Sequence, residues 1–324
     1  ASGNIHFRWH DKRIAEGITM TGQYVIRYVA KRLNEYLNKI CKTKDVDYSF
    51  YSDTDSTYIT LGTFVKQNFA DKSKKEISQL LDKFCDTALS KVIDKALEDI
   101  FKYNNVFQKK LSFKREVIAD SGVWLAKKRY ALNVYDSEGV IYEKPKLKVQ
   151  GMEIVRSSTP ASVRSTLKES VGIVLTKDED TLRDYVRNIE DKWHKLPPPD
   201  IAFPRTVNNV SEYKDSSSIF RKGTPIHVKG ALMYNHLLTT KNLKQKYQEI
   251  YDSDKIKFVY LKKQNPLGIN VITFRSEIPP EFRLDDYVDY DMMFSKAYLE
   301  PLQSLLNVVG WSVKEQATLE GLFG

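Results

Sequence analysis

Apolar side chains recur every three or four residues along two long segments of the chain. The first covers residues 12–40 and includes Ile14, Ile18, Val25 and Val29. The second covers residues 74–103 and has the same spacing. A period near 3.6 residues predicts an amphipathic helix in each segment. Between the two helices, residues 47–51 and 57–61 are rich in aromatic and β-branched side chains, which predicts the strands of a hairpin.

After residue 110 the pattern changes to alternation. Residues 111–118 alternate apolar and polar side chains, and Tyr130, Leu132 and Val134 form a second alternating run. Both runs predict strands, and the turn residues 137–139 lead the second run into a further strand at residues 140–142. Helices on either side of a hairpin, followed by strands, predict an α+β fold in which helices back an antiparallel sheet.

The rest of the chain has a mainly helical pattern. Helices are predicted from Pro160 to about residue 175 and over residues 179–195, 230–238 and 292–309, with a hairpin of residues 256–262 and 269–274. A basic stretch begins just after Glu143. We therefore predict three parts: residues 1–142, residues 143–315, and a short tail of residues 316–324.

Candidate chemistry is concentrated at the tip of the first predicted hairpin. Asp53 and Asp55 lie there, two residues apart, between the two strands. Two carboxylates at one turn repel each other, but their oxygen atoms suit Mg²⁺. An ordinary hairpin turn is the alternative, because Asp and Thr are common in turns. The chain has four other Asp-x-Asp pairs in charged, turn-like segments, which we interpret as solvated loops: Asp45/Asp47, Asp178/Asp180, Asp252/Asp254 and Asp289/Asp291.

The flanking residues favour the functional interpretation. Residues 51–56 read Tyr-Ser-Asp-Thr-Asp-Ser, which resembles motif C of family B DNA polymerases, with Ser52 in place of the usual Gly. Residues 127–130 resemble the Lys-x-Tyr motif of that family, and residues 114–116 resemble the palm strand before it. The resemblance extends over essentially the whole chain, and within this family the sequence closely resembles the polymerases of T-even-type phages.

The resemblance implies a partial polymerase palm in residues 1–142 and a thumb in residues 143–315. It also implies that Asp55 and Asp53 bind two Mg²⁺ ions as catalytic ligands. Glu116, expected on a neighbouring strand, would be a third carboxylate near the same metals. Two ions of this kind activate the primer hydroxyl and stabilise the leaving pyrophosphate.

A second set of residues is expected to contact primer–template DNA. Lys128 and Tyr130 lie two apart on an expected strand, and therefore on one face. The alternative is a solvated basic run beside a buried tyrosine. The expected DNA-binding residues are Lys127, Lys128, Arg129, Tyr130, Lys146 and Lys148. A net charge of +9 is consistent with a polyanionic partner but is weak evidence alone.

The last residues carry a separate signal. Gln316, Leu319, Leu322 and Phe323 form a Gln-x-x-Leu-x-x-Leu-Phe pattern, which resembles a sliding-clamp-binding peptide. The alternative is a terminal segment that packs on its own domain.

Composition excludes several other classes. The chain has no apolar run long enough to span a membrane, no P-loop and no zinc-type cluster, and its two cysteines suggest a reducing compartment. We therefore expect no membrane partner and, by the resemblance, a place in the cytoplasm of a phage-infected bacterial cell.

Parts of the family pattern have no counterpart in this sequence. We find no motif A, no fingers helix with its triphosphate-binding Lys, and no 3′–5′ exonuclease. We therefore expect the C-terminal part of a split polymerase, active on dNTPs only with an N-terminal chain that supplies those parts, or else a truncated piece. The alternative is a non-catalytic fragment that binds DNA and tethers the clamp.

Overall fold

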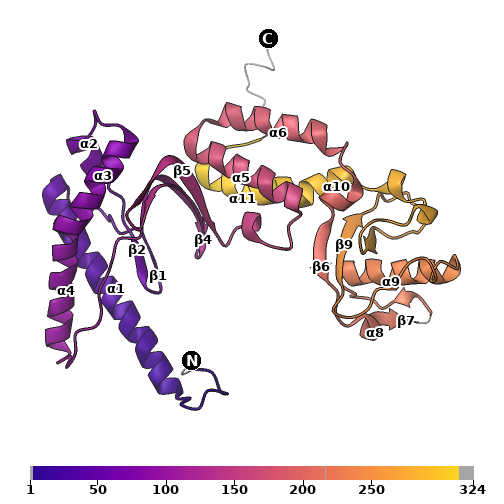
Figure 1. Ribbon diagram of the computed structural model, residues 1–324, viewed down its shortest axis with the longest axis horizontal. Coiled ribbons are helices and arrows are strands. Elements are labelled where there is room, and N and C mark those ends of the chain that lie inside the picture. The colour runs from indigo at the N-terminus through magenta and orange to yellow at the C-terminus, as the bar shows by residue number, and fades with distance from the viewer. Residues whose placement is uncertain (1–2, 216, 314–324) are drawn as a thin grey trace, which may run out of the picture. The chain divides into compact units, whose positions relative to one another are not determined.

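The computed structural model describes residues 3–215 and 217–313, and the chain divides into two compact units (Figure 1). Unit 1 comprises Ala1–Ser121 and Asn133–Lys146, and unit 2 comprises Gly122–Leu132 and Leu147–Gly324. Strands β3, β4 and β5 contribute residues to both units. No helix within the described ranges combines the length and apolar character needed to cross a membrane.

Unit 1 is built from helices, one small hairpin and parts of three strands. Its elements are α1 (Lys12–Cys41), β1 (Tyr51–Asp53), β2 (Ser56–Tyr58), α2 (Gly62–Asn68), α3 (Lys74–Phe84), the π-helical turn η1 (Cys85–Leu89), α4 (Ser90–Tyr103), and parts of β3 (Val117–Ala126), β4 (Arg129–Ser137) and β5 (Val140–Gln150).

The core of unit 1 lies between α1 and α4. Asp11 caps the first turn of α1 by accepting a hydrogen bond from the backbone N–H of Arg13. In the C-terminal half of α1, Val29, Leu33 and Leu37 are almost completely buried and recur at helical spacing. They pack with apolar residues of α4 in one continuous cluster. Burial of such side chains stabilises the fold by about 1.5–3 kcal/mol each.

Unit 2 contains the remaining elements. They are η2 (Glu153–Val155), α5 (Ala161–Thr176), α6 (Glu179–Trp193), α7 (Pro198–Ile201), β6 (Phe203–Thr206), α8 (Val210–Tyr213), β7 (Lys214–Asp215), β8 (Ile219–Phe220), α9 (Ile226–Thr240), β9 (Lys255–Tyr260), β10 (Val271–Phe274), η3 (Pro280–Phe282), η4 (Asp285–Tyr287), α10 (Tyr290–Phe294), η5 (Ser295–Leu299) and α11 (Glu300–Val309).

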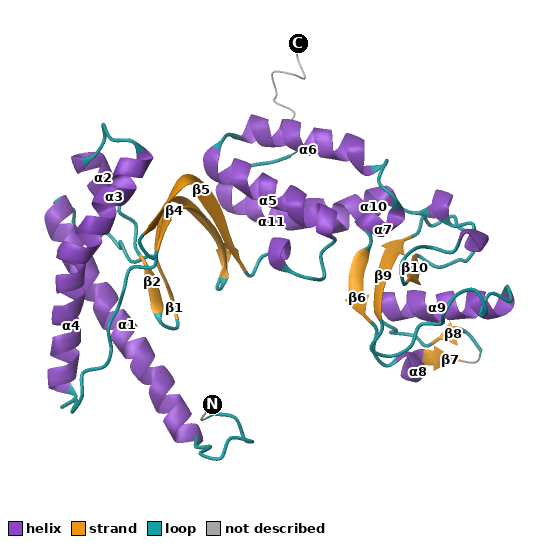
Figure 2. Ribbon diagram, viewed as in Figure 1, coloured by secondary structure: helices purple, strands orange, loops and turns teal. Residues whose placement is uncertain are grey.

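A small antiparallel sheet lies within unit 2. Its strand order is β10-β9-β6, and Val271 pairs with Tyr260 across the β9–β10 hairpin. Helix α9 packs on this sheet (Figure 2). Gly230 of α9 makes the close approach possible, because a Cβ there would lie 2.9 Å from the backbone nitrogen of Thr273.

The observed elements agree with most of the predicted pattern, and the α+β class is confirmed. Both long helices form, although a π-helical turn interrupts the second. The predicted strand at residues 111–118 is wrong for residues 111–116, because β3 begins only at Val117. Strand β5 runs across the boundary predicted near residue 142, and the domain assignment itself stays a prediction.

Candidate metal centre and nucleic-acid interface

The Asp-x-Asp pair lies at a tight turn. Strands β1 and β2 are antiparallel, with Asp53 opposite Ser56, so that Thr54 and Asp55 form the turn. Thr54 has a φ of 36°, and its hydroxyl donates a hydrogen bond to Oδ1 of Asp53 over 3.1 Å. Asp55 is exposed. Both carboxylates therefore belong to one short turn, where hard oxygen ligands are available together.

The hairpin is fixed from several directions within unit 1. The rings of Tyr51 and Tyr58 pack across the two strands with centroids 5.5 Å apart. The hydroxyls of Ser49 and Thr57 are 2.7 Å apart, at hydrogen-bonding distance. Helix α1 runs beside the tip, because a Cβ at Gly22 would lie 3.8 Å from the carbonyl oxygen of Thr54. The turn is thus supported by both packing and hydrogen bonds.

Glu116 lies in an irregular segment that precedes β3, so its expected position on a strand is wrong. The reason is the neighbouring Arg115, whose guanidinium forms ion pairs with Asp82 of α3 and with the fully buried Asp136 of β4. The backbone N–H of Glu138 also donates a hydrogen bond to the carbonyl oxygen of Glu116 over 2.6 Å. These bonds hold the segment at the sheet without extending β3 through it.

The donor set fits Mg²⁺ only in part. Asp53 and Asp55 supply carboxylate oxygens, which are the ligands that this ion takes. In the part of the chain that the structure describes, no group of three or more His, Cys, Asp or Glu side chains could hold a metal. Glu116 is therefore not brought into a complete site with the two aspartates. Further ligands would have to come from outside this sequence or from water.

The basic residues expected at the DNA are divided between a turn and a strand. Lys127 and Lys128 form the two-residue turn between β3 and β4, and both are exposed. Lys128 has a φ of 62°, so the expectation that it lies on a strand with Tyr130 is wrong. A two-residue connection needs left-handed backbone, and that requirement takes Lys128 out of the strand.

The segment after β5 holds this turn in place. Gly151 has a φ of +65°, and a Cβ there would overlap the carbonyl oxygen of Lys128 and lie 3.1 Å from its carbonyl carbon. Only glycine permits this approach of two backbone segments. Arg129 donates from Nη2 to both carboxylate oxygens of Glu153 over 2.9 Å. The hydroxyl of Tyr130 donates to Gln150 over 2.9 Å.

These contacts give Arg129 and Tyr130 structural partners within unit 2. Tyr130 is only 4% exposed, and its ring stacks on Trp124 with centroids 6.0 Å apart. Arg129 is about one-third exposed. Of the four residues in the basic motif, Lys127 and Lys128 therefore have the most accessible side chains.

Lys146 and Lys148 both lie on β5. Nζ of Lys146 lies 4.0 Å from the ring centroid of Tyr142, a cation–π contact that leaves the lysine exposed. Lys148 is half-buried.

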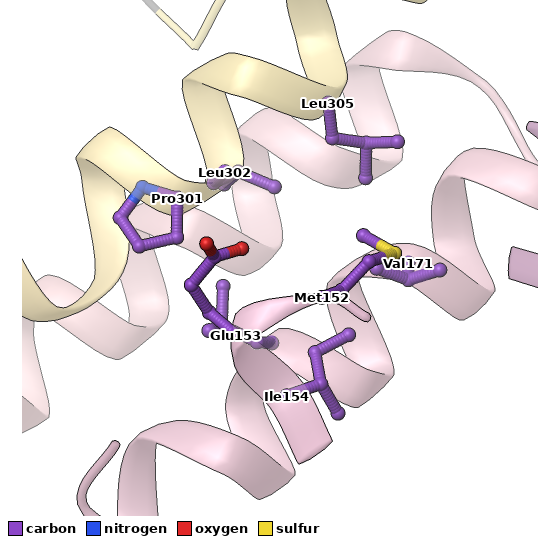
Figure 3. Close-up of a pocket in the computed structure, with 8 residues that line it drawn as sticks. Met152, Glu153, Ile154, Val171, Pro301, Leu302 and Leu305 are labelled. Atoms are coloured by element: carbon purple, nitrogen blue, oxygen red, sulfur yellow. The ribbon is translucent and has the colours of Figure 1, made fainter. Parts of the chain in front are cut away.

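Beyond β5, η2 packs against α5 and α11 around a cavity of about 10 Å³. Figure 3 shows Met152, Ile154 and Leu305 among the apolar side chains that line it, with the carboxylate of Glu153 at one side. This volume is about that needed for a single water molecule. The space is too small for a nucleotide, so Glu153 acts here as the partner of Arg129.

Comparison with known proteins gives a consistent picture. No protein-family model matches the sequence. All of the chain aligns with the DNA-directed DNA polymerase of Enterobacteria phage T4 at 34% identity, and with that of Escherichia phage RB69 at 31% identity. The whole chain is therefore similar to a part of these two DNA-directed DNA polymerases. The chain spans 37% of the length of each phage protein. It also aligns, over 98% of its own length and at 22% identity, with 16% of the length of a Methanocaldococcus jannaschii DNA polymerase.

The residues that hold the basic turn are not among the site residues predicted from the sequence. They are Gln150, Gly151 and Glu153. The one available signal was a glycine directly after a strand, which often marks a close backbone approach. The expected clamp-binding residues Gln316, Leu319, Leu322 and Phe323 lie outside the described residues.

Proposed function

We propose that this chain supplies the C-terminal part of the palm, and the thumb, of a family B DNA-directed DNA polymerase that acts in the cytoplasm of a phage-infected bacterium. The substrates are a primer–template duplex and a dNTP. Motif A, the fingers and the exonuclease come from polypeptide outside this sequence, either the same chain or a second one. The observation that carries the proposal is the alignment of the whole chain, at 34% identity, with 37% of a phage DNA-directed DNA polymerase, with Asp53 and Asp55 at a hairpin turn.

Asp53 and Asp55 would hold Mg²⁺ through their carboxylate oxygens. When bound, the metal supplies Lewis-acid stabilisation for nucleotidyl transfer. The β1–β2 turn keeps the two carboxylates together, and Gly22 of α1 lies beside that turn. Glu116 stays a candidate for a supporting carboxylate, although it precedes β3.

The exposed turn residues Lys127 and Lys128 would bind backbone phosphates of the duplex, and Lys146 and Lys148 would add further contacts. Arg129 and Tyr130 would act mainly by holding the turn through Glu153 and Gln150. Phosphate contacts fix register and affinity and carry no sequence information. Such contacts suit an enzyme that copies any template.

Substitution of Asp55 tests the catalytic role in the complete polymerase, with motif A and the fingers present. Asp55→Asn removes the charge and keeps the shape. We expect primer extension to fall by far more than tenfold while duplex affinity is retained, because tenfold corresponds to only about 1.4 kcal/mol. Asp45→Asn is the matched control, since Asp45 is an exposed member of another Asp-x-Asp pair.

The outcome separates catalysis from the non-catalytic alternative. If Asp55→Asn and Asp45→Asn extend primers equally well, Asp55 does not carry the reaction. If the parent complex binds duplex and clamp but never extends a primer, the chain is a DNA-binding and clamp-tethering fragment.

The tail is proposed to bind a sliding clamp through Leu322 and Phe323, because apolar anchors fill hydrophobic pockets on such partners. Replacing both residues with Ala should abolish the clamp-dependent gain in product length and leave synthesis without clamp unchanged, since a tethered enzyme rebinds at high effective concentration. Clamp stimulation that survives this double change would refute the assignment.

A further inference from the structure

A cavity of about 320 Å³ lies at the N-terminal end of α5, entirely within unit 2. Its walls come from the loop before α5, from the first turn of that helix, and from the segment around α7. Lys257 of β9 completes the lining. None of these residues belongs to the hairpin or to the basic turn discussed above.

The first turn of α5 presents unused hydrogen-bond donors to this region. Pro160 occupies the N-cap position, and no side chain caps the helix. Helical bonding starts with the N–H of Arg164, which donates to the carbonyl oxygen of Pro160. The first N–H groups of a helix have no intrahelical acceptor, and the helix dipole adds partial positive charge there. For the 16 residues of α5, this end favours an anion.

The nearly buried residue Thr159 provides independent support for a ligand. Thr159 is only 6% exposed, yet it lines the cavity. Its backbone N–H donates to the carbonyl oxygen of Arg156, whereas its hydroxyl has no hydrogen-bond partner among the described residues. This hydroxyl is therefore available to a ligand bound in the cavity, beside the unused end of the helix.

The charged side chains of the lining favour a ligand with negative charge. Arg164 lines the cavity and has no ion-pair partner within the described ranges. Nζ of Lys257 donates to the carbonyl oxygen of Pro199 over 2.9 Å, which places its ammonium group near α7 at the wall. Asp200 is the opposing carboxylate in the lining. Two cations, one carboxylate and a helix N-terminus together favour a compact anion with several acceptor oxygens.

We propose that this cavity is a phosphate-binding site formed by the N-terminus of α5, Thr159 and Arg164. The inference rests on the proposed function only for the source of the phosphate, which we assign to the backbone of the duplex. One water molecule needs about 10–15 Å³ of such space, so this cavity is large enough for a phosphate together with part of its sugar. The same donors would take free phosphate or pyrophosphate.

The first experiment uses inorganic phosphate as the probe on the whole chain. The melting temperature is measured in phosphate and in chloride at equal ionic strength, because a ligand that binds only the folded state raises it. We expect the melting temperature of the parent to be higher in phosphate than in chloride. That rise should disappear in Thr159→Val and in Arg164→Gln and persist in Lys168→Gln, an exposed control further along α5. Melting temperatures in chloride report whether each variant is still folded.

The second experiment measures duplex affinity across a range of salt concentrations. Loss of one phosphate contact should lower the slope of log affinity against log salt by about one. A lower slope in Arg164→Gln, but not in Lys168→Gln, identifies the duplex as the source. If Arg164→Gln loses the rise in melting temperature in phosphate but keeps the salt slope of the parent, the site is supported and its ligand is free phosphate.

The proposal is overturned if the parent gains no additional rise from phosphate and Arg164→Gln leaves the salt slope unchanged. It is also overturned if Thr159→Val and Arg164→Gln keep the additional rise in melting temperature in phosphate and Arg164→Gln keeps the salt slope of the parent. Failure of the parent to bind duplex at all would contradict the proposed function, whereas the phosphate experiment would still test the cavity. The two conclusions can therefore fail separately.

Discussion

Gly151→Ala is the sharpest test of how the basic turn is held. Gly151 follows β5 and has a φ of +65°, a conformation that L-residues rarely adopt. A Cβ there would overlap the carbonyl oxygen of Lys128 and would also lie 3.2 Å from Cγ of Arg129. Since the first of these neighbours is backbone, the alanine can fit only if the turn moves.

The expected loss has two parts. Left-handed backbone costs a non-glycine residue about 1 kcal/mol. Displacing the packed turn adds about 1–3 kcal/mol, the usual cost of overpacking. For a unit of 150–250 residues each kcal/mol lowers the melting temperature by about 2–4 °C, so we expect a decrease of roughly 5–15 °C. Thermal unfolding followed by circular dichroism measures it.

Gly139→Ala is the matched control. Gly139 has a φ of +87°, but a Cβ there would meet nothing within 4 Å. This variant should lose only the backbone contribution, about 1 kcal/mol. Equal losses in the two variants would refute the argument that Gly151 is required by its contact with Lys128. If the turn binds DNA, Gly151→Ala should also weaken duplex affinity, and Gly139→Ala should not.

Three further predictions concern titratable groups. Burial raises the pKa of the Cys85 thiol to about 11, so iodoacetamide at pH 8 should label it at least tenfold more slowly in folded than in unfolded protein, as mass spectrometry would show. The hydrogen bond to Asp291 raises the pKa of His194. The stabilisation from this hydrogen bond is therefore present at low pH and is lost as the pH rises through the folded-state pKa of His194. Asp291→Asn should lower that pKa in an NMR titration. Arg115→Met should destabilise unit 1 by about 3–5 kcal/mol in denaturant unfolding, and a simultaneous Asp136→Asn should restore part of it, because the single change leaves a buried charge unpaired.

The long helices could be predicted because their apolar spacing is regular over many turns. α1 and α4 contain most of the buried residues of unit 1, and burial imposes that spacing on the sequence. The π-helical turns η1 and η5 could not be predicted, because one extra residue in a turn leaves no recognisable pattern. The clamp peptide and the metal site depend on groups outside the described structure, so their predictions rest on resemblance.

Two local errors have a common physical cause. The alternation over residues 111–118 predicts a strand, but a strand also needs a neighbour along its whole length. Here the ion pairs of Arg115 with Asp82 and Asp136 hold the segment through side chains, and β3 starts after it. Likewise, Lys128 lies in the β3–β4 turn, and Gly151 lies against its carbonyl group. Both partners are distant in sequence, and no local pattern identifies them.

The five Asp-x-Asp pairs show what structure adds to a motif. In each of the other four, at least one aspartate accepts a hydrogen bond that fixes local structure: Asp47 from Asn34, Asp178 from Thr181, Asp252 from Val210 and Asp289 from Met292. Asp53 accepts one from the adjacent Thr54, whereas Asp55 has no such partner in the described part of the chain. Two like charges at one turn cost free energy, and at Asp55 no structural bond offsets that cost. Asp45 likewise has no such partner in the described part of the chain, so the choice between the pairs depends on the residues that flank Asp53 and Asp55.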